Sequence, residues 1–172
     1  MGKFILGFIT AIVVIVIAGF LVIAFGLMPT RQDIKPGAIE TWVAKTSLRA
    51  TIKRETAGLA ATMPPSEPNL TAGAKLYADN CQPCHGGPNG QASPIAKGLA
   101  PDPPQLAKDG VEDDPEGVTY WTIAHGIRFT GMPGFIGSLS DPQIWQLALF
   151  LKHMDKLPPQ TQQAWAAASA RR

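Results

Sequence analysis

The stretch of sequence that decides the fold lies at positions 81–85 and reads Cys81-Gln82-Pro83-Cys84-His85. Two cysteines three positions apart, followed at once by a histidine, form the pattern of covalent haem attachment, in which two thiols join the porphyrin and the imidazole ligates the iron. A zinc site would need four ligands, but the sequence has no further cysteine. A thioredoxin-like cysteine pair would need a βαβ pattern, which the sequence does not show. We therefore predict one covalent haem c, held by Cys81 and Cys84, with His85 on the iron.

The residues before this motif resemble the opening of a known fold. A helix is expected after Thr71, as its cap, and it carries Gly73 and Tyr77 at intervals of four before the first cysteine. This spacing, together with the motif, resembles class I cytochromes c. In that family the first and last helices cross closely at a small residue, and an aromatic of the last helix joins the crossing. Phe150 is the position that matches.

A second signature lies about fifty residues further on and reads Thr130-Gly131-Met132-Pro133-Gly134-Phe135. A methionine between glycine and proline is expected in a stiff, extended loop. The run resembles the distal-ligand loop of class I cytochromes c, and this resemblance implies Met132 as the sixth iron ligand. The rival ligands elsewhere in the chain are Met63, Met154, His125 and His153. Both histidines fall on predicted helices, where a surface or core role is the more ordinary one.

Between the two signatures the sequence is dense in glycine and proline up to about Asp114. Prolines at 101, 103 and 104 exclude a helix interior or a central strand there. In cytochromes of this type a proline-bearing loop packs beside the haem-ligating histidine, and a backbone carbonyl of the loop fixes the imidazole ring. A ligand imidazole commonly needs such an acceptor. Pro104 and Leu106 are the candidates.

The N-terminal segment, residues 1–29, is predicted to be a transmembrane anchor. Phe4 to Met28 is a run of 25 residues without a charge, and a helix of that length spans about 37 Å, enough to cross a bilayer. A cleaved signal peptide would have a shorter apolar region followed by an Ala-x-Ala site, which is missing here.

Charge is distributed unevenly along the chain. Up to Met63 there are seven Lys/Arg and three Asp/Glu, whereas the rest of the chain carries eight Lys/Arg and ten Asp/Glu. The positive-inside tendency alone would place the C-terminal side in the cytoplasm. Covalent haem attachment in families with this motif takes place outside the bacterial inner membrane, and we give the motif precedence. We expect a single-pass inner-membrane protein with a periplasmic haem domain. The sequence has no basic run flanked by aromatics, so we expect no nucleic-acid binding.

Four segments are predicted beyond the anchor. Residues 30–62 form a basic amphipathic helix beginning near Pro36, and two interpretations stay open: Trp42 at the lipid surface, or docking on another subunit. Residues 63–69 form a proline-rich linker, and 70–158 the cytochrome domain. Its last helix is expected to begin at Asp141 as cap, with Pro142 in the first turn. The tail, 159–172, with Trp165, is interpreted as a short helix that packs on a partner.

The resemblance covers about residues 70–157 and implies an all-α class I cytochrome c domain. The transmembrane helix and the amphipathic helix that precede it lie outside the resemblance and are predicted from the sequence pattern alone. The resemblance implies a single-electron carrier, not an enzyme, because His85 and Met132 fill both axial positions and leave none for a small-molecule substrate. The expected partners are the lipid bilayer, a respiratory or photosynthetic membrane complex, and a soluble electron donor or acceptor. The protein would serve the complex either as a fixed subunit or as a tethered carrier. The alternative is a haem-based sensor or peroxidase-like protein with a labile distal ligand.

Overall fold

The computed structural model describes residues 1–171, and within that range every regular element is a helix. The prediction of an all-α fold with an N-terminal apolar helix is confirmed. The chain divides into two compact units, one of residues Met1–Ile34 and one from Lys35 onward.

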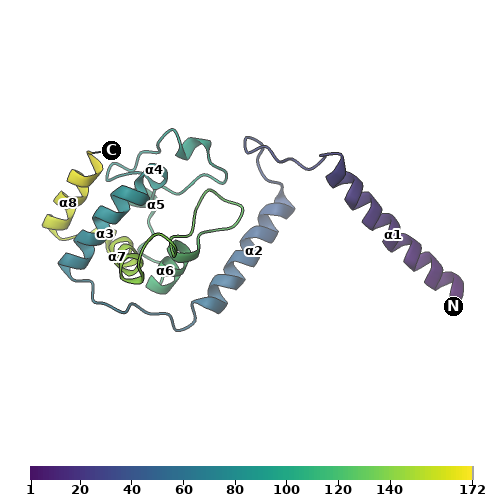
Figure 1. Ribbon diagram of the computed structural model, residues 1–172, viewed down its shortest axis with the longest axis horizontal. Helices are drawn as coiled ribbons and strands as arrows, with labels where there is room; N and C mark the ends of the chain where they lie inside the picture. The colour runs from purple at the N-terminus through teal and green to yellow at the C-terminus, as the bar shows by residue number, and fades with distance from the viewer. Residues whose placement is uncertain (172) are drawn as a thin grey trace. The chain divides into compact units, whose positions relative to one another are not determined.

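The first unit contains one long helix, α1 (Gly2–Ala24), drawn in purple in Figure 1. It is 23 residues long, contains an 18-residue window with a mean hydropathy of 3.0 and has no buried residue, so by length and composition it is able to cross a membrane. The helix stops four residues before Met28, the last large apolar residue of the N-terminal run. Gly26 lies just beyond it with φ +64°, a left-handed conformation that commonly follows a helix end.

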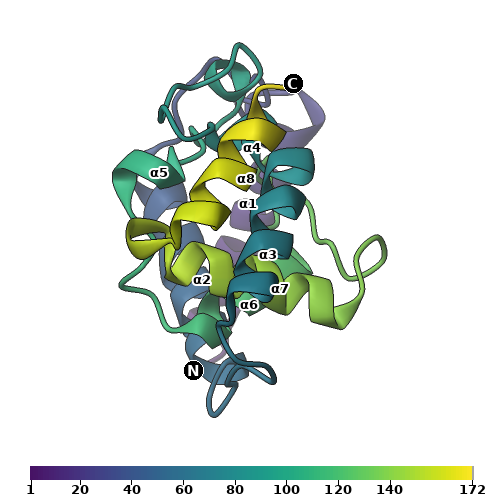
Figure 2. The ribbon, with the colours of Figure 1, turned by 90° about the vertical axis from the view of Figure 1, so that its left-hand side faces the viewer.

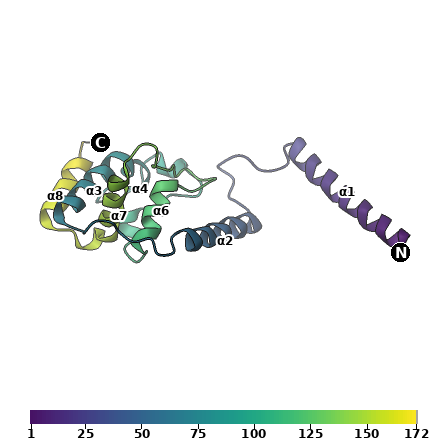
Figure 3. The same cartoon turned by 60° about the horizontal axis from the view of Figure 1, so that its bottom comes forward.

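The second unit holds the remaining helices, of which η1 and η2 are short 3₁₀ turns. They are α2 (Ala38–Glu55), α3 (Glu67–Asn80), α4 (Gln82–His85), η1 (Ala96–Gly98), α5 (Leu106–Asp109), α6 (Glu116–His125), α7 (Asp141–Lys152), η2 (Met154–Lys156) and α8 (Pro159–Ser169). Helix α3 packs against both α7 and α8, and α7 also packs against α6 (Figures 1 and 2). Helices α2 and α8 lie at opposite ends of this unit (Figure 3).

The contact between α3 and α7 depends on a residue without a side chain. A Cβ placed on Gly73 would lie 2.2 Å from the carbonyl oxygen of Gln146 and 2.7 Å from Cβ of Phe150. One turn further along α3, the fully buried ring of Tyr77 meets that of Phe150 with centroids 5.5 Å apart. The close crossing that the resemblance implied, small residue and aromatics included, is present.

Helix α3 begins earlier than predicted. Its first residue is Glu67, so positions 67–69, expected in the extended linker, are helical. Pro68 stands in the first turn, where its missing N–H would have had no partner in any case. Thr71 is therefore not the cap; its hydroxyl lies 2.8 Å from the hydroxyl of Thr161 on α8.

The start of the predicted last helix also differs. Helix α7 is preceded by Ser140, whose backbone N–H donates to the side-chain oxygen of Gln143 at 2.9 Å, so the cap is one residue before Asp141. The chain then continues into α8, which packs on α3. Trp165 is buried and meets the ring of Tyr77 edge-on at 5.8 Å. The tail is therefore part of the same aromatic core.

Helices α6 and α7 are joined by a tyrosine. The ring of Tyr120 stacks on Trp145 with centroids 4.2 Å apart, and its hydroxyl donates to the carboxylate of Asp141. That hydrogen bond, with a smaller contribution from burial, raises the pKa of Tyr120 to about 12.

We expect Gly73→Ala to lower the free energy of unfolding by about 1–3 kcal/mol, because the new methyl group overlaps a backbone oxygen that has no room to move. Denaturant unfolding measures the change. Gly98→Ala is the matched control, since a Cβ there meets nothing within 4 Å. Equal stabilities for the two variants would show that the helix crossing is looser than described.

We expect the free energy of unfolding to fall as the pH rises from 10 to about 12. The unfolded state releases the Tyr120 proton near pH 10, whereas the folded state holds it to about 12, so the stabilisation is complete below pH 10 and lost above it. The pKa of Tyr77 is raised by burial and adds to the same trend. In Tyr120→Phe the decline, followed by thermal unfolding at each pH, is expected to be shallower than in the wild type; an identical pH profile would contradict the assignment.

Candidate functional site: an apolar pocket between two loops

The Cys-x-x-Cys-His motif forms a tight turn at the end of α3. Backbone N–H groups of Cys84 and His85 both donate to the carbonyl of Cys81, at 3.1 and 2.9 Å. The hydroxyl of Tyr77 donates to the carbonyl of Gly86 at 2.8 Å and also lies 3.2 Å from that of His85. The turn is thereby attached to the helix crossing, because the ring of Tyr77 packs in the crossing and its hydroxyl binds the carbonyls of the turn.

The imidazole of His85 is oriented by the proline-rich loop. Its Nδ1 lies 2.9 Å from the carbonyl oxygen of Pro104, which can only accept, so the proton is on Nδ1 and the lone pair on Nε2. Burial lowers the pKa of His85, although the bond to Pro104 opposes this. A neutral ring with a free Nε2 is the form that ligates a metal. Of the two candidates, Pro104 supplies the acceptor; Leu106 begins α5.

Gln105 is a residue that the sequence reasoning missed. Its side-chain amide donates to the carbonyl of Cys84 at 3.2 Å and to that of Pro103 at 3.1 Å. It therefore ties the proline-rich loop to the Cys-x-x-Cys-His turn beside the bond from His85 to Pro104. Gly86 leaves the space for it: a Cβ there would lie 2.5 Å from the side-chain oxygen of Gln105. The only signal in the sequence is a polar residue directly after three prolines in a loop.

The second loop, which carries Met132, folds back on the end of α6. Gly126 has φ +65°, and a Cβ on it would lie within 2.6 Å of the backbone of Met132 and Pro133. The N–H of Ile127 donates to the carbonyl of Met132 at 3.1 Å. The hydroxyl of Thr130 accepts from the N–H of Met132 at 3.1 Å. The methionine is thus held by backbone contacts on both sides.

Both loops face one apolar pocket, which encloses about 650 Å³ free of protein atoms, its open mouth included. Cys81, Cys84, His85 and Met132 all contribute to its walls, with Leu99, Pro101, Ile127 and Phe135 among the other lining residues. The rival ligands are not in this wall. Met63 and Met154 pack on the hydrophobic core, the Nδ1 of His153 lies 2.9 Å from the carbonyl of Leu149, and His125 is exposed at the end of α6.

The chemistry of this wall fits a haem. A porphyrin needs an apolar cleft, and its iron needs nitrogen or sulfur ligands. The pocket offers the Nε2 of His85 and the thioether of Met132. Burial, with a smaller contribution from Cys84, raises the pKa of the Cys81 thiol to about 12. A protonated, buried thiol is a poor thiol–disulfide reagent, which speaks against a redox-active cysteine pair.

The comparison with protein families agrees with this geometry. Residues 68–151 match the family model described as "Cytochrome C oxidase, cbb3-type, subunit III". The matched segment covers α3 to most of α7, just under half of the chain. The comparisons with curated proteins and with solved structures gave no match. Residues 68–151 therefore form a c-type cytochrome domain, and its all-helical fold is that of class I. The family implies haem c as the cofactor and redox proteins as partners.

We expect Gln105→Ala to raise the reduction potential and to lower the free energy of unfolding by about 1–3 kcal/mol. Two carbonyls lose their donor, and a looser Pro104 carbonyl makes the His85 ring less basic, so it stabilises the oxidised iron less. A redox titration and denaturant unfolding measure the two effects. The control is Gln163→Ala, an exposed glutamine of α8. If stability falls while the potential stays unchanged, Gln105 supports the loop without positioning the ligand.

Proposed function

We propose that this protein is a membrane-anchored carrier of single electrons with one covalent haem c. In this proposal Cys81 and Cys84 would attach the porphyrin, and His85 and Met132 would ligate its iron. The observation that carries the proposal is the meeting of these four side chains in the wall of one apolar pocket, although Met132 is 47 positions further along the chain than His85.

Each part of the pocket has a task in electron transfer. The haem, when bound, supplies an iron that alternates between two oxidation states. Pro104 holds the His85 ring in one orientation and one tautomer, so that little rearranges when the charge changes. The backbone contacts of Gly126 and Ile127 keep Met132 at the pocket in the same way. A thioether ligand raises the reduction potential. Because His85 and Met132 would both ligate the iron, a substrate would find no free ligand position, which favours a carrier over a catalyst.

Helix α1 supports a location at the bacterial inner membrane, crossed once, with the haem domain on the periplasmic side. The helix has the length and apolarity of a span. The periplasmic side follows from covalent haem attachment, which in proteins with this motif takes place there. The partners in this proposal are a respiratory or photosynthetic membrane complex that donates or accepts electrons, directly or through a soluble carrier.

Two ways of serving such a complex remain, as a fixed subunit or as a carrier on a tether. A tail that packs on a partner, as expected from the sequence, would favour a fixed subunit, but Trp165 is buried in the protein's own core and does not support that choice. Purification in mild detergent separates the two cases, because a fixed subunit brings stoichiometric membrane partners with it and a tethered carrier does not.

We expect Met132→Ala to abolish the sulfur-to-iron charge-transfer band at the red end of the oxidised spectrum and to lower the reduction potential, because the thioether is lost. Met63→Ala is the matched control, since Met63 packs on the core outside the pocket. Absorption spectroscopy and a redox titration of both variants provide the test.

Carbon monoxide separates the proposal from its rival. The reduced wild type is expected to keep its spectrum under carbon monoxide, whereas Met132→Ala is expected to bind the gas. A wild type that lacks the band and binds carbon monoxide would favour a sensor or peroxidase-like protein with a labile distal ligand.

A further inference from the structure

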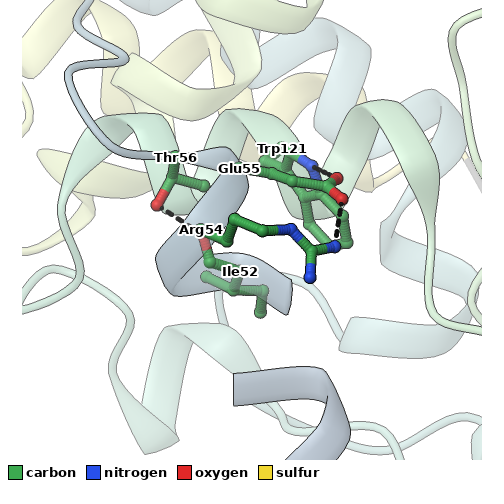
Figure 4. A network of polar contacts seen from close by, with 5 residues as sticks. All are labelled: Ile52, Arg54, Glu55, Thr56 and Trp121. Carbon is green, nitrogen blue, oxygen red and sulfur yellow. Dashed lines mark hydrogen bonds and ion pairs between the residues drawn. The ribbon is translucent and has the colours of Figure 1, made fainter. Parts of the chain in front are cut away.

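Helix α2 is attached to the cytochrome domain at its C-terminal end. The carboxylate of Glu55, in the last turn, accepts a hydrogen bond from the indole N–H of Trp121 on α6 at 2.9 Å and pairs with Arg54 at 2.8 Å (Figure 4). Just beyond the helix, the carbonyl of Leu59 packs so closely on α6 that a Cβ on Gly117 would lie 2.3 Å from it. These contacts determine how α2 projects from the domain.

Apolar side chains lie on two sides of α2, which differs from the single stripe expected of an amphipathic helix. Leu48 and Ile52 are half-buried on the side that faces the domain. Ile39, Trp42 and Val43, spaced by three and one along the first turns, are 79, 67 and 51% exposed. We call these three residues the α2 patch. Packing on the cytochrome domain accounts for the first side only, so the patch requires another occupant.

The charges around the α2 patch favour an anionic occupant. Between positions 31 and 55 there are six Lys/Arg and three Asp/Glu. Two of the three acids are already paired, Asp33 with Arg31 and Glu55 with Arg54. Arg49 and Lys53, which follow Trp42 at helical intervals of seven and eleven, share its side of the helix and are exposed. An apolar patch bordered by basic residues is the composition of a helix that lies in a lipid interface.

The short connection between α1 and α2 also favours lipid as the occupant of the α2 patch. The last large apolar residue of the N-terminal run is Met28, and only positions 29–37 separate it from α2. Nine residues extend to at most about 30 Å. If α1 crosses the bilayer, the α2 patch is therefore always close to the head groups at which α1 leaves it. Tryptophan is also the side chain most typical of that layer.

We propose that the α2 patch binds the head-group region of an anionic lipid bilayer, with Arg49 and Lys53 at the lipid phosphates. This rests on the part of the proposed function in which α1 spans the membrane. Because Glu55 and Leu59 hold α2 on α6, lipid binding at the patch orients the haem domain over the membrane surface. The domain then presents a constant face to its redox partners instead of rotating on a loose tether.

The test uses the full chain with its haem, reconstituted in vesicles of phosphatidylcholine with phosphatidylglycerol. Both natural cysteines are bound to the porphyrin in the proposed function, so Val43→Cys provides one site for a spin label. Unmutated protein, labelled in parallel, gives the background. Matched labels are placed at Gln163→Cys, exposed on α8 at the far end of the domain, and at Val13→Cys in α1. Collisions with oxygen, which concentrates in lipid, are compared with collisions with a water-soluble nickel complex.

We expect the ratio of oxygen to nickel collisions at position 43 to be several-fold higher than at position 163. The ratio is expected to fall in pure phosphatidylcholine and in the double variant Arg49→Glu and Lys53→Glu. A position 43 label that is as accessible to nickel as position 163 in both kinds of vesicle overturns the proposal.

Two further outcomes are informative. A label at position 43 shielded from both reagents shows a protein occupant and also overturns it. The label at position 13 reports the anchor separately: lipid exposure at 13 without it at 43 refutes only the role of the α2 patch, whereas water exposure at 13 refutes the membrane span as well.

Discussion

The side chain of Tyr77 links the helix crossing to the Cys-x-x-Cys-His turn. Its ring lies fully buried between Phe150 and Trp165, and its hydroxyl reaches the carbonyls of His85 and Gly86. Burial raises the pKa of this hydroxyl, so it stays a neutral donor at physiological pH. A buried donor without an acceptor is costly. The turn therefore cannot move relative to the crossing without leaving the hydroxyl unpaired, and the position of His85 is tied to the crossing of α3 and α7.

Features carried by consecutive residues were the most predictable from the sequence. The Cys-x-x-Cys-His turn, the loop with Met132 and the prolines before Gln105 are short patterns whose backbone consequences are local. The crossing at Gly73 was also foreseen, but through resemblance to a family and not through periodicity. That these segments line one pocket depends on the fold as a whole, which the resemblance implied and the structure shows.

The features that were missed depend on contacts between distant residues. Periodicity indicates that a helix has an apolar side, but it does not say what that side meets. Trp165 was therefore assigned to a partner although it packs on Tyr77, and α2 was given one apolar stripe where the structure has two sides. The same reason explains the misplaced cap at Thr71: its hydroxyl had a plausible local task, but its actual partner is Thr161, ninety positions away. Gln105 was overlooked because its acceptors belong to two different loops.

The packing of Leu59 against Gly117 has a consequence for how the length of this chain can vary. Positions 29–37, before α2, are exposed throughout, so residues can be added or removed there with little effect on the fold. The connection from α2 to α3 is different, because Leu59, Ala61 and Met63 pack on the core and the carbonyl of Pro64 accepts from the side chain of Asn69. An insertion there would have to displace packed residues. Natural variation in the first connection would change the length of chain between α1 and α2, whereas the second connection keeps the position of α2 on the cytochrome domain constant.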